Sequence, residues 1–191
     1  FNSGNGDAVV TSELAHGGSR AAKLTISATG SDTGARLHRW SEAEAYDKAY
    51  YSAWYYFPQR YDVLAGWWNV FQFKSRTEEK NDPFWILYVG NRRDGTMYLY
   101  LRNWITKRSY QQQVADIPVG RWFKVEVYLD QSDDGTGEIR VWQDGVELFH
   151  LTEITTGYPG GRTRWGVTNY SSNITPRPTT IYVDDAEIRV P

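Results

Sequence analysis

The sequence of 191 residues contains no cysteine, one methionine, three histidines and no long apolar run. Because there is no cysteine, disulfide and thiolate chemistry are excluded, and the cellular compartment cannot be inferred from disulfide bonds. No apolar segment approaches the length needed to span a membrane, so we expect no membrane partner. The formal net charge of −2 provides no global basic field, so we expect no nucleic-acid partner either.

Aromatic residues, in contrast, are abundant, with 9 Trp and 14 Tyr. Many can serve as core filler and as cross-strand pairs in a β-sandwich. That role does not account for strands on which aromatics alternate with an apolar set. Successive side chains of a strand point to opposite faces, so residues 96–104 separate Met97, Leu99 and Leu101 from the set Tyr98, Tyr100, Arg102 and Trp104.

Residues 67–74 give a second strand of this kind. Its alternation predicts Phe71 and Phe73 inside and Trp68, Val70, Gln72 and Lys74 outside. A face of rings interrupted by Gln, Lys and Arg suits a sugar chain, because rings stack on pyranoses and planar polar groups bond hydroxyls. We therefore expect a concave polysaccharide-binding face. Its predicted substrate-binding residues are Arg36, Trp68, Gln72, Lys74, Tyr98, Tyr100, Arg102 and Trp104.

The charge around these strands is uneven. From residue 72 to residue 108 there are eight Lys or Arg residues against four acids. The alternatives are a solvated, loop-rich region and a locally basic binding face. Both remain open from the sequence alone.

The remaining pattern predicts an all-β fold. Residues 121–130 and 137–143 alternate apolar positions with charges of both signs, as in a solvated sheet, and we assign them to the convex side. Asp144-Gly145 is a strong hairpin signal. The one helix-like fragment is Ser41–Tyr46, where Ser41 and Glu44 fit a capping box. Short strands at regular spacing predict one domain, residues 1–191, built as an antiparallel two-sheet β-sandwich or jelly roll of the concanavalin type.

A structural Ca²⁺ is the one cofactor that the residues suggest. Glu13 precedes a loop containing Gly17-Gly18, and the carbonyl groups of such a loop are oxygen ligands for Ca²⁺. Asp184-Asp185 completes the set if the terminal strands pair, so Glu13 and Asp185 are the predicted ligands. The alternative is a plain turn with surface acids, which we favour slightly.

The sequence begins at Phe1 without a signal peptide. This start predicts either a mature form or a part of a longer protein, such as a multidomain enzyme. An extracellular, secreted origin is expected from the polysaccharide hypothesis alone.

Four stretches resemble the family of heparin lyase I-like and glucuronan lyase-like polysaccharide lyases, which have a concanavalin-type jelly roll. The stretches are residues 68–74, 119–124, 137–145 and 181–185, and the resemblance extends over roughly residues 36 to 188. It implies a concave sheet that holds a polysaccharide.

The resemblance also implies catalytic residues. In such lyases, a Gln followed two residues later by a His helps to neutralise the uronate carboxylate and to transfer the proton. Gln72 matches the Gln, whereas Lys74 stands where the His would be. Tyr170 matches a Tyr on a late strand of these lyases that acts as base or acid. Residues 36–39, which include His38, match an early strand of the family that carries Arg residues. If the chain is a lyase, its catalytic residues are thus Gln72, Lys74, His38 and Tyr170.

Three functions remain open. We expect first a non-catalytic carbohydrate-binding module, because the aromatic face needs no His. The alternatives are a polysaccharide lyase that cleaves a uronate-containing glycan by β-elimination and a protein-interaction sandwich, since Trp, Tyr and Arg also favour protein interfaces. Glycoside hydrolysis is the weakest enzymatic interpretation, because the outward residues of the proposed binding strands include no pair of carboxylates.

Overall fold

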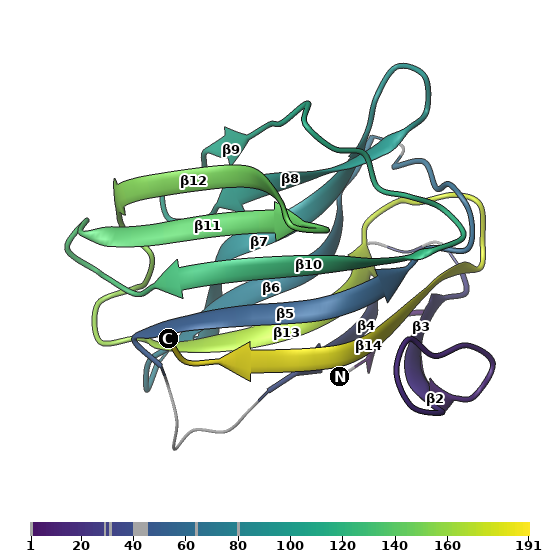
Figure 1. Ribbon diagram of the computed structural model, residues 1–191, viewed down its shortest axis with the longest axis horizontal. Helices are drawn as coiled ribbons and strands as arrows, with labels where there is room; N and C mark the ends of the chain where they lie inside the picture. The colour runs from purple at the N-terminus through teal and green to yellow at the C-terminus, as the bar shows by residue number, and fades with distance from the viewer. Residues whose placement is uncertain (1, 29, 31, 40–45, 64, 80) are drawn as a thin grey trace.

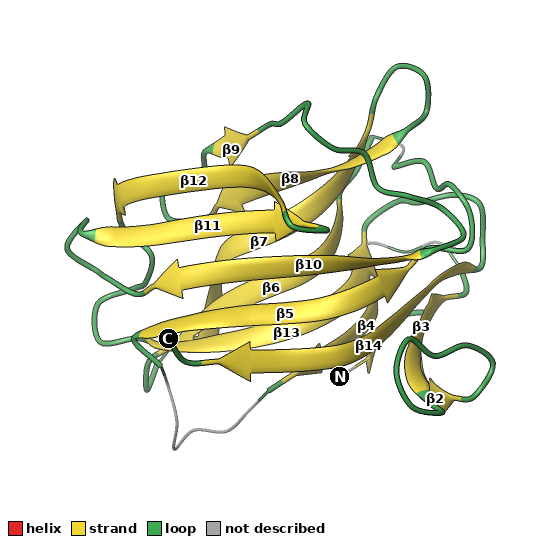
Figure 2. Cartoon of the chain, viewed as in Figure 1, coloured by secondary structure: helices red, strands yellow, loops and turns green. Residues whose placement is uncertain are grey.

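The computed structural model describes residues 2–28, 30, 32–39, 46–63, 65–79 and 81–191. These residues form fourteen strands and, within the described parts of the chain, no helix (Figure 2). None of the described residues belongs to a helix long and apolar enough to cross a membrane. The predicted helix-like fragment, together with Trp40, falls outside the described residues except for Tyr46.

Two seven-stranded antiparallel sheets form a sandwich, as predicted (Figure 1). Sheet A has the order β1-β4-β13-β6-β7-β8-β9. Its strands are β1 (Asn2–Ser3), β4 (Thr33–His38), β13 (Arg162–Ser171), β6 (Trp68–Arg76), β7 (Asn81–Asn91), β8 (Met97–Asn103) and β9 (Ser109–Tyr110).

Sheet B lies in front of sheet A in Figure 1 and has the order β12-β11-β10-β5-β14-β3-β2. Its strands are β12 (Val146–Ile154), β11 (Gly137–Gln143), β10 (Trp122–Asp130), β5 (Lys48–Tyr56), β14 (Thr179–Arg189), β3 (Ala21–Ile26) and β2 (Gly6–Thr11).

The core lies between the sheets and follows the predicted alternation. In β8, Met97, Leu99 and Leu101 are buried against sheet B, whereas the tyrosines between them are half-exposed. Strand β10 shows the same period, with its charged side chains, Trp122 and Tyr128 on the solvent side and Phe123 in the core. Because the period of two persists along both strands, each sheet has one apolar face and one outer face.

Strand β6 departs from the prediction. Trp68 and Val70 were expected on the outer face, but both side chains are buried, and Trp68 packs against Phe57 at a ring-centroid distance of 5.2 Å. The pairing of β6 with β7 is irregular between Asn69 and Phe71, and its pairing with β13 is irregular at the same level. An extra residue in a strand resets which side chains face inward. Trp68 is therefore a core residue.

The buried Asn169 side chain joins the two sheets. Its amide nitrogen donates hydrogen bonds to the carbonyl oxygens of Leu24 and Thr179 at 2.9 and 3.0 Å. Its amide oxygen accepts one from the indole nitrogen of Trp68 at 2.9 Å. One side chain thus satisfies three buried polar groups, each of which would otherwise carry a desolvation penalty.

We therefore expect Asn169→Ala to lower the free energy of unfolding by more than about 2 kcal/mol, because three buried partners lose their hydrogen bonds. Urea denaturation followed by tryptophan fluorescence measures the change. Asn2→Ala serves as the control, since its bond to Asp7 is exposed, and should change stability by less than about 0.5 kcal/mol. Equal effects of the two substitutions would contradict the role given to Asn169.

Candidate active site

One transverse line of residues crosses six strands on the outer face of sheet A. Gly166 of β13 pairs with His38 of β4 on one side and with Gln72 of β6 on the other. Gln72 pairs in turn with Ile86, Ile86 with Arg102, and Arg102 with Ser109. Directly paired residues share a face of the sheet. We call this line, composed of His38, Gly166, Gln72, Ile86, Arg102 and Ser109, the polar row.

Gly166 allows His38 and Gln72 to approach each other at the β4 end of the polar row. A Cβ atom at this position would lie 2.5 Å from Cδ2 and 2.8 Å from Nε2 of His38. The imidazole therefore occupies the space above the glycine, between β4 and β6. Any larger residue at 166 would push His38 away from this position.

A second line on the same face consists mainly of aromatic rings. Tyr170 pairs with Asn69, Asn69 with Tyr88, and Tyr88 with Tyr100. The rings of Tyr88 and Tyr100 stack at 5.2 Å with an interplanar angle of 15°. Trp67 lies between Tyr170 and Tyr88, at centroid distances of 4.9 and 6.3 Å. We call Tyr170, Trp67, Asn69, Tyr88 and Tyr100 the ring row.

The strands of sheet A are strongly basic. Their only acid is Asp82, near the start of β7. Their Lys and Arg residues are Arg36, Lys74, Arg76, Arg102, Arg162 and Arg164. The positive charge noted between residues 72 and 108 thus extends over the strands of this whole sheet. Such a face attracts polyanions.

Burial and this charge together control the protonation of His38. Burial and the neighbouring positive charges of Lys74, Arg36 and Arg164 lower its pKa from 6.5 to about 4. Burial, Arg36 and Arg164 also lower the pKa of Lys74. The imidazole is therefore neutral at physiological pH and is able to accept a proton.

Tyr170 lies at the other side of this charge cluster. The guanidinium carbon of Arg36 is 4.2 Å from the centroid of its ring. Burial raises the pKa of the phenol, although Arg36 opposes the shift. Tyr170 therefore retains its proton at neutral pH and is able to donate it. Of the four predicted catalytic residues, His38, Gln72 and Lys74 lie around Gly166, and Tyr170 lies four residues further along β13.

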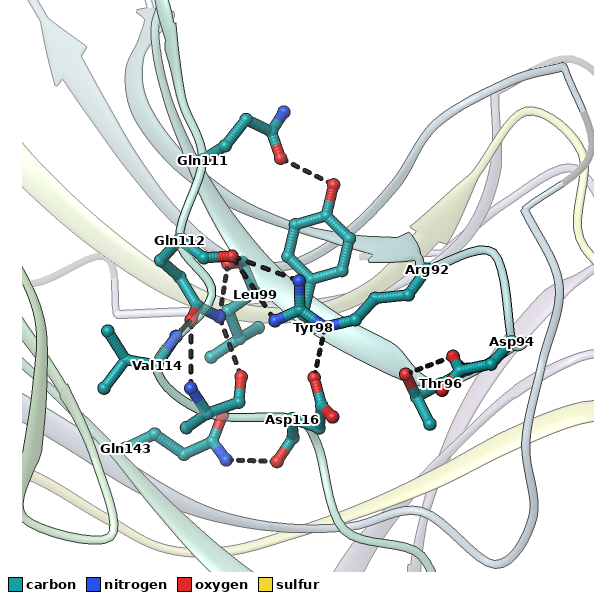
Figure 3. A network of polar contacts seen from close by, with 11 residues as sticks. Arg92, Asp94, Thr96, Tyr98, Leu99, Gln111, Gln112, Val114, Asp116 and Gln143 are labelled. Carbon is teal, nitrogen blue, oxygen red and sulfur yellow. Dashed lines mark hydrogen bonds and ion pairs between the residues drawn. The ribbon is translucent and has the colours of Figure 1, made fainter.

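The remaining predicted binding residues are on the same face. Tyr98 donates a hydrogen bond to Gln111 and lies under Arg92, whose guanidinium is paired with Asp116 (Figure 3). The indole nitrogen of Trp104 donates to the Tyr88 hydroxyl at 3.1 Å, and the Trp104 residue is 38% exposed. The rings at 98, 100 and 104 thus lie outside the core, as the alternation predicted.

Comparison with known proteins decides the family. The family model described as polysaccharide lyase matches residues 2–187. This chain belongs to the polysaccharide lyase family. That membership overturns our first expectation of a non-catalytic binding module, because the family is one of enzymes and its members share this fold. No curated protein sequence matches the chain.

Solved structures of other lyases resemble this family member. The endo-β-1,4-glucuronan lyase of the fungus Trichoderma reesei superposes with a TM-score of 0.79 at 14% identity, covering 100% of this chain and 90% of that one. The marine PL-14 alginate lyase of Aplysia kurodai gives 0.65 at 14% identity, covering 96% and 87%. The alginate lyase vAL-1 from Chlorella virus gives 0.61 at 12% identity, covering 95% and 88%. At such identities the likeness shows the shared β-jelly roll.

Sequence reasoning missed three residues of this face of sheet A, namely Trp67, Tyr88 and Arg164. Trp67 was hidden because the irregularity in β6 exchanges the roles of the two adjacent tryptophans. Tyr88 lies in a continuous apolar stretch, 84–89, which gives no period from which to assign faces. Arg164 pairs with Lys74 across β13 and β6. This pairing depends on the order of strands in the sheet, which the sequence pattern does not give.

The predicted calcium ligands have protein partners. The Glu13 carboxylate accepts hydrogen bonds from Lys23 and from the Tyr182 hydroxyl. The Asp185 carboxylate contacts Nδ1 of His16 at 2.7 Å. Among the described residues, no group of three or more His, Cys, Asp or Glu side chains converges as a metal site. A structural Ca²⁺ bound by Glu13 and Asp185 therefore stays a prediction from the sequence.

The low pKa of His38 leads to a pH prediction. NMR titration should give a midpoint near pH 4 for the imidazole that disappears in His38→Gln. Because the unfolded chain binds this proton at 6.5 and the native chain only near 4, His38 should reduce stability as the pH falls through this window. A native midpoint of 6 or higher would show that burial and the surrounding charges do not lower the pKa of His38.

Proposed function

We propose that this family member is a polysaccharide lyase that cleaves a uronate-containing glycan by β-elimination on the outer face of sheet A. The observation that carries the proposal is the register of the polar row, which brings His38 and Gln72 to either side of Gly166 on a basic face. The family match supports the reaction class. The glucuronan and alginate substrates named for the similar structures support a polyuronate.

The first requirement of the reaction is neutralisation of the uronate carboxylate, which makes the proton on C5 acidic. The Gln72 amide donates a hydrogen bond to a carboxylate oxygen, while Lys74 and Arg164, which pair across β6 and β13, supply positive charge. These groups lie on the strands before substrate arrives, so little reorganisation is needed. Their stabilisation grows as charge moves onto the carboxylate in the transition state.

The second requirement is a base and an acid. His38 is neutral and accepts the C5 proton, whereas Tyr170 is protonated and donates to the glycosidic oxygen on C4. The C5–H and C4–O bonds break, the C4=C5 double bond forms, and the leaving oxygen carries the proton from Tyr170. Proton exchange with water then restores both side chains.

Hydrolysis is a poor alternative on this face. A glycosidase needs two carboxyl groups that flank the scissile bond. The described strands of sheet A contain Asp82 as their only acid, and its position near the start of β7 is exposed. Elimination needs no carboxylate from the protein.

Three further points belong to this proposal. Because the substrate is a polysaccharide, we expect the enzyme to act outside the cell. The chain is either a mature form or part of a multidomain enzyme, and the loop near Glu13 and Asp185 is either a structural Ca²⁺ site or a plain turn with surface acids; these alternatives stay as the sequence left them.

We expect Tyr170→Phe to lower kcat/KM on polyuronates by roughly 100-fold or more, because the leaving oxygen loses its proton donor. The measurement follows the ultraviolet absorbance of the unsaturated product. The matched control is Tyr128→Phe on the outer face of sheet B, which should leave the rate unchanged. If both variants behave like the parent enzyme, Tyr170 is not the acid. If the parent releases no unsaturated product from a broad panel of uronate polymers, the proposed reaction is wrong.

A further inference from the structure

Positively charged residues lie directly opposite one another on β6 and β13. Arg164 pairs with Lys74, and two residues further along the same strands Arg162 pairs with Arg76. The register is regular over this stretch, so the alternation of the strands places all four side chains on the face that carries Gly166. We call Lys74, Arg76, Arg162 and Arg164 the cation patch, and Arg76 with Arg162 its outer pair.

This arrangement of charge favours an anionic ligand. Like charges that lie directly opposite each other in an antiparallel pair are destabilising. Burial, Arg36 and Arg164 lower the pKa of Lys74. Asp82 opposes this shift and is the only acid on the described strands of sheet A. Two consecutive pairs of like charge therefore create a positive potential that an oxyanion would relieve.

The acids of the loop that follows β6 border a different space. Glu78 and Glu79 line a cavity of about 600 Å³ together with Tyr158 and Ser75. Ser75 alternates with the cations of β6, and its side chain is buried on the inner side of the strand. The carboxylates nearest to the cation patch in the sequence thus border a cavity that reaches the inner side of β6.

The outer pair lies too far along the strands to contact the reacting carboxylate. Four residues of extended strand, about 13 Å, separate Arg76 from Gln72, whereas Lys74 is two residues away. In the proposed reaction, Gln72 and Lys74 hold the carboxylate of the reacting sugar. The carboxylates of the neighbouring sugars follow the polar row across the strands. A group that reaches the outer pair therefore projects sideways from the glycan.

We infer that Arg76 and Arg162, assisted by Lys74 and Arg164, bind a second oxyanion that projects from the side of the glycan. This inference rests on the proposed function and deepens it. The substrate class is a uronate polymer with an additional anionic substituent, either a sulfate ester or the carboxylate of a uronate branch. A guanidinium donates in parallel to two oxygens of one oxyanion. The cation patch holds the substituent and takes no part in bond breaking, so its contribution appears in KM.

The test uses an unsubstituted polyuronate that the parent cleaves, the same backbone with sulfate esters, and the same backbone with uronate branches. Substitution should raise kcat/KM of the parent about tenfold, mainly through KM, because charge-assisted hydrogen bonds form at the outer pair. A gain with one polymer alone identifies its substituent as the ligand, and a gain with both shows that the patch accepts either oxyanion. Unchanged or slower cleavage of both substituted polymers would overturn the inference.

Arg76→Met and Arg162→Met each remove one charge from the outer pair. Each should reduce the gain to about twofold or less and leave kcat/KM on the unsubstituted polymer nearly unchanged. Arg108→Met is the matched control. The Arg108 guanidinium lies 5.0 Å from the ring centroid of Tyr110, which pairs with the buried Leu101, so this charge lies away from the polar row. Its removal should preserve the gain.

Circular dichroism and thermal unfolding verify that each variant is folded. Arg76 and Arg162 are both exposed, so either variant remains informative if the other is unstable. An equal loss of the gain in Arg108→Met would show that net charge alone sets the preference, and would overturn the inference. A full gain in both outer-pair variants would do the same.

Affinity electrophoresis in gels of the substituted polymers separates this inference from the proposed reaction. If the parent cleaves no uronate, the reaction fails. Retardation of the parent that Arg162→Met reduces and Arg108→Met preserves would still support the cation patch. Equal migration of the parent and Arg162→Met would remove the patch as well.

Discussion

The close approach of His38 to Gly166 is the contact on which the site depends. Because position 166 has no side chain, the imidazole lies above β13 and beside Gln72, within the field of Lys74, Arg36 and Arg164. Burial and that field keep the imidazole neutral. In the proposed reaction, the same positive charges attract the carboxylates of the substrate, so one arrangement serves both binding and proton transfer.

The two sheets divide the charge of a chain whose net charge is nearly zero. Sheet A is basic, whereas the outer face of sheet B combines acids with paired bases, such as Lys124 with Glu126. A polyanion is therefore directed to one face of the sandwich. On that face, rings and polar groups form parallel rows across the strands, as expected for a surface that holds an extended sugar chain.

Much of the fold follows from side-chain alternation, because a period of two is a local property of the sequence. It correctly separated Leu99 from Tyr100 in β8. It failed at Trp68, since the irregularity in β6 depends on how two other strands pair with it. The pattern by itself did not bring His38 next to Gln72, because β4, β13 and β6 are neighbours only through the order of strands; the two residues were grouped through the family resemblance. Pattern alone favoured a binding module, and the family match corrected that expectation.

The most direct test is a crystal structure of the His38→Gln variant with a bound oligouronate. The account predicts a sugar chain lying across the strands of sheet A, with one carboxylate at Gln72 and Lys74 and the scissile oxygen near Tyr170. A chain bound to the outer face of sheet B, or one running parallel to the strands away from Gly166, would contradict it.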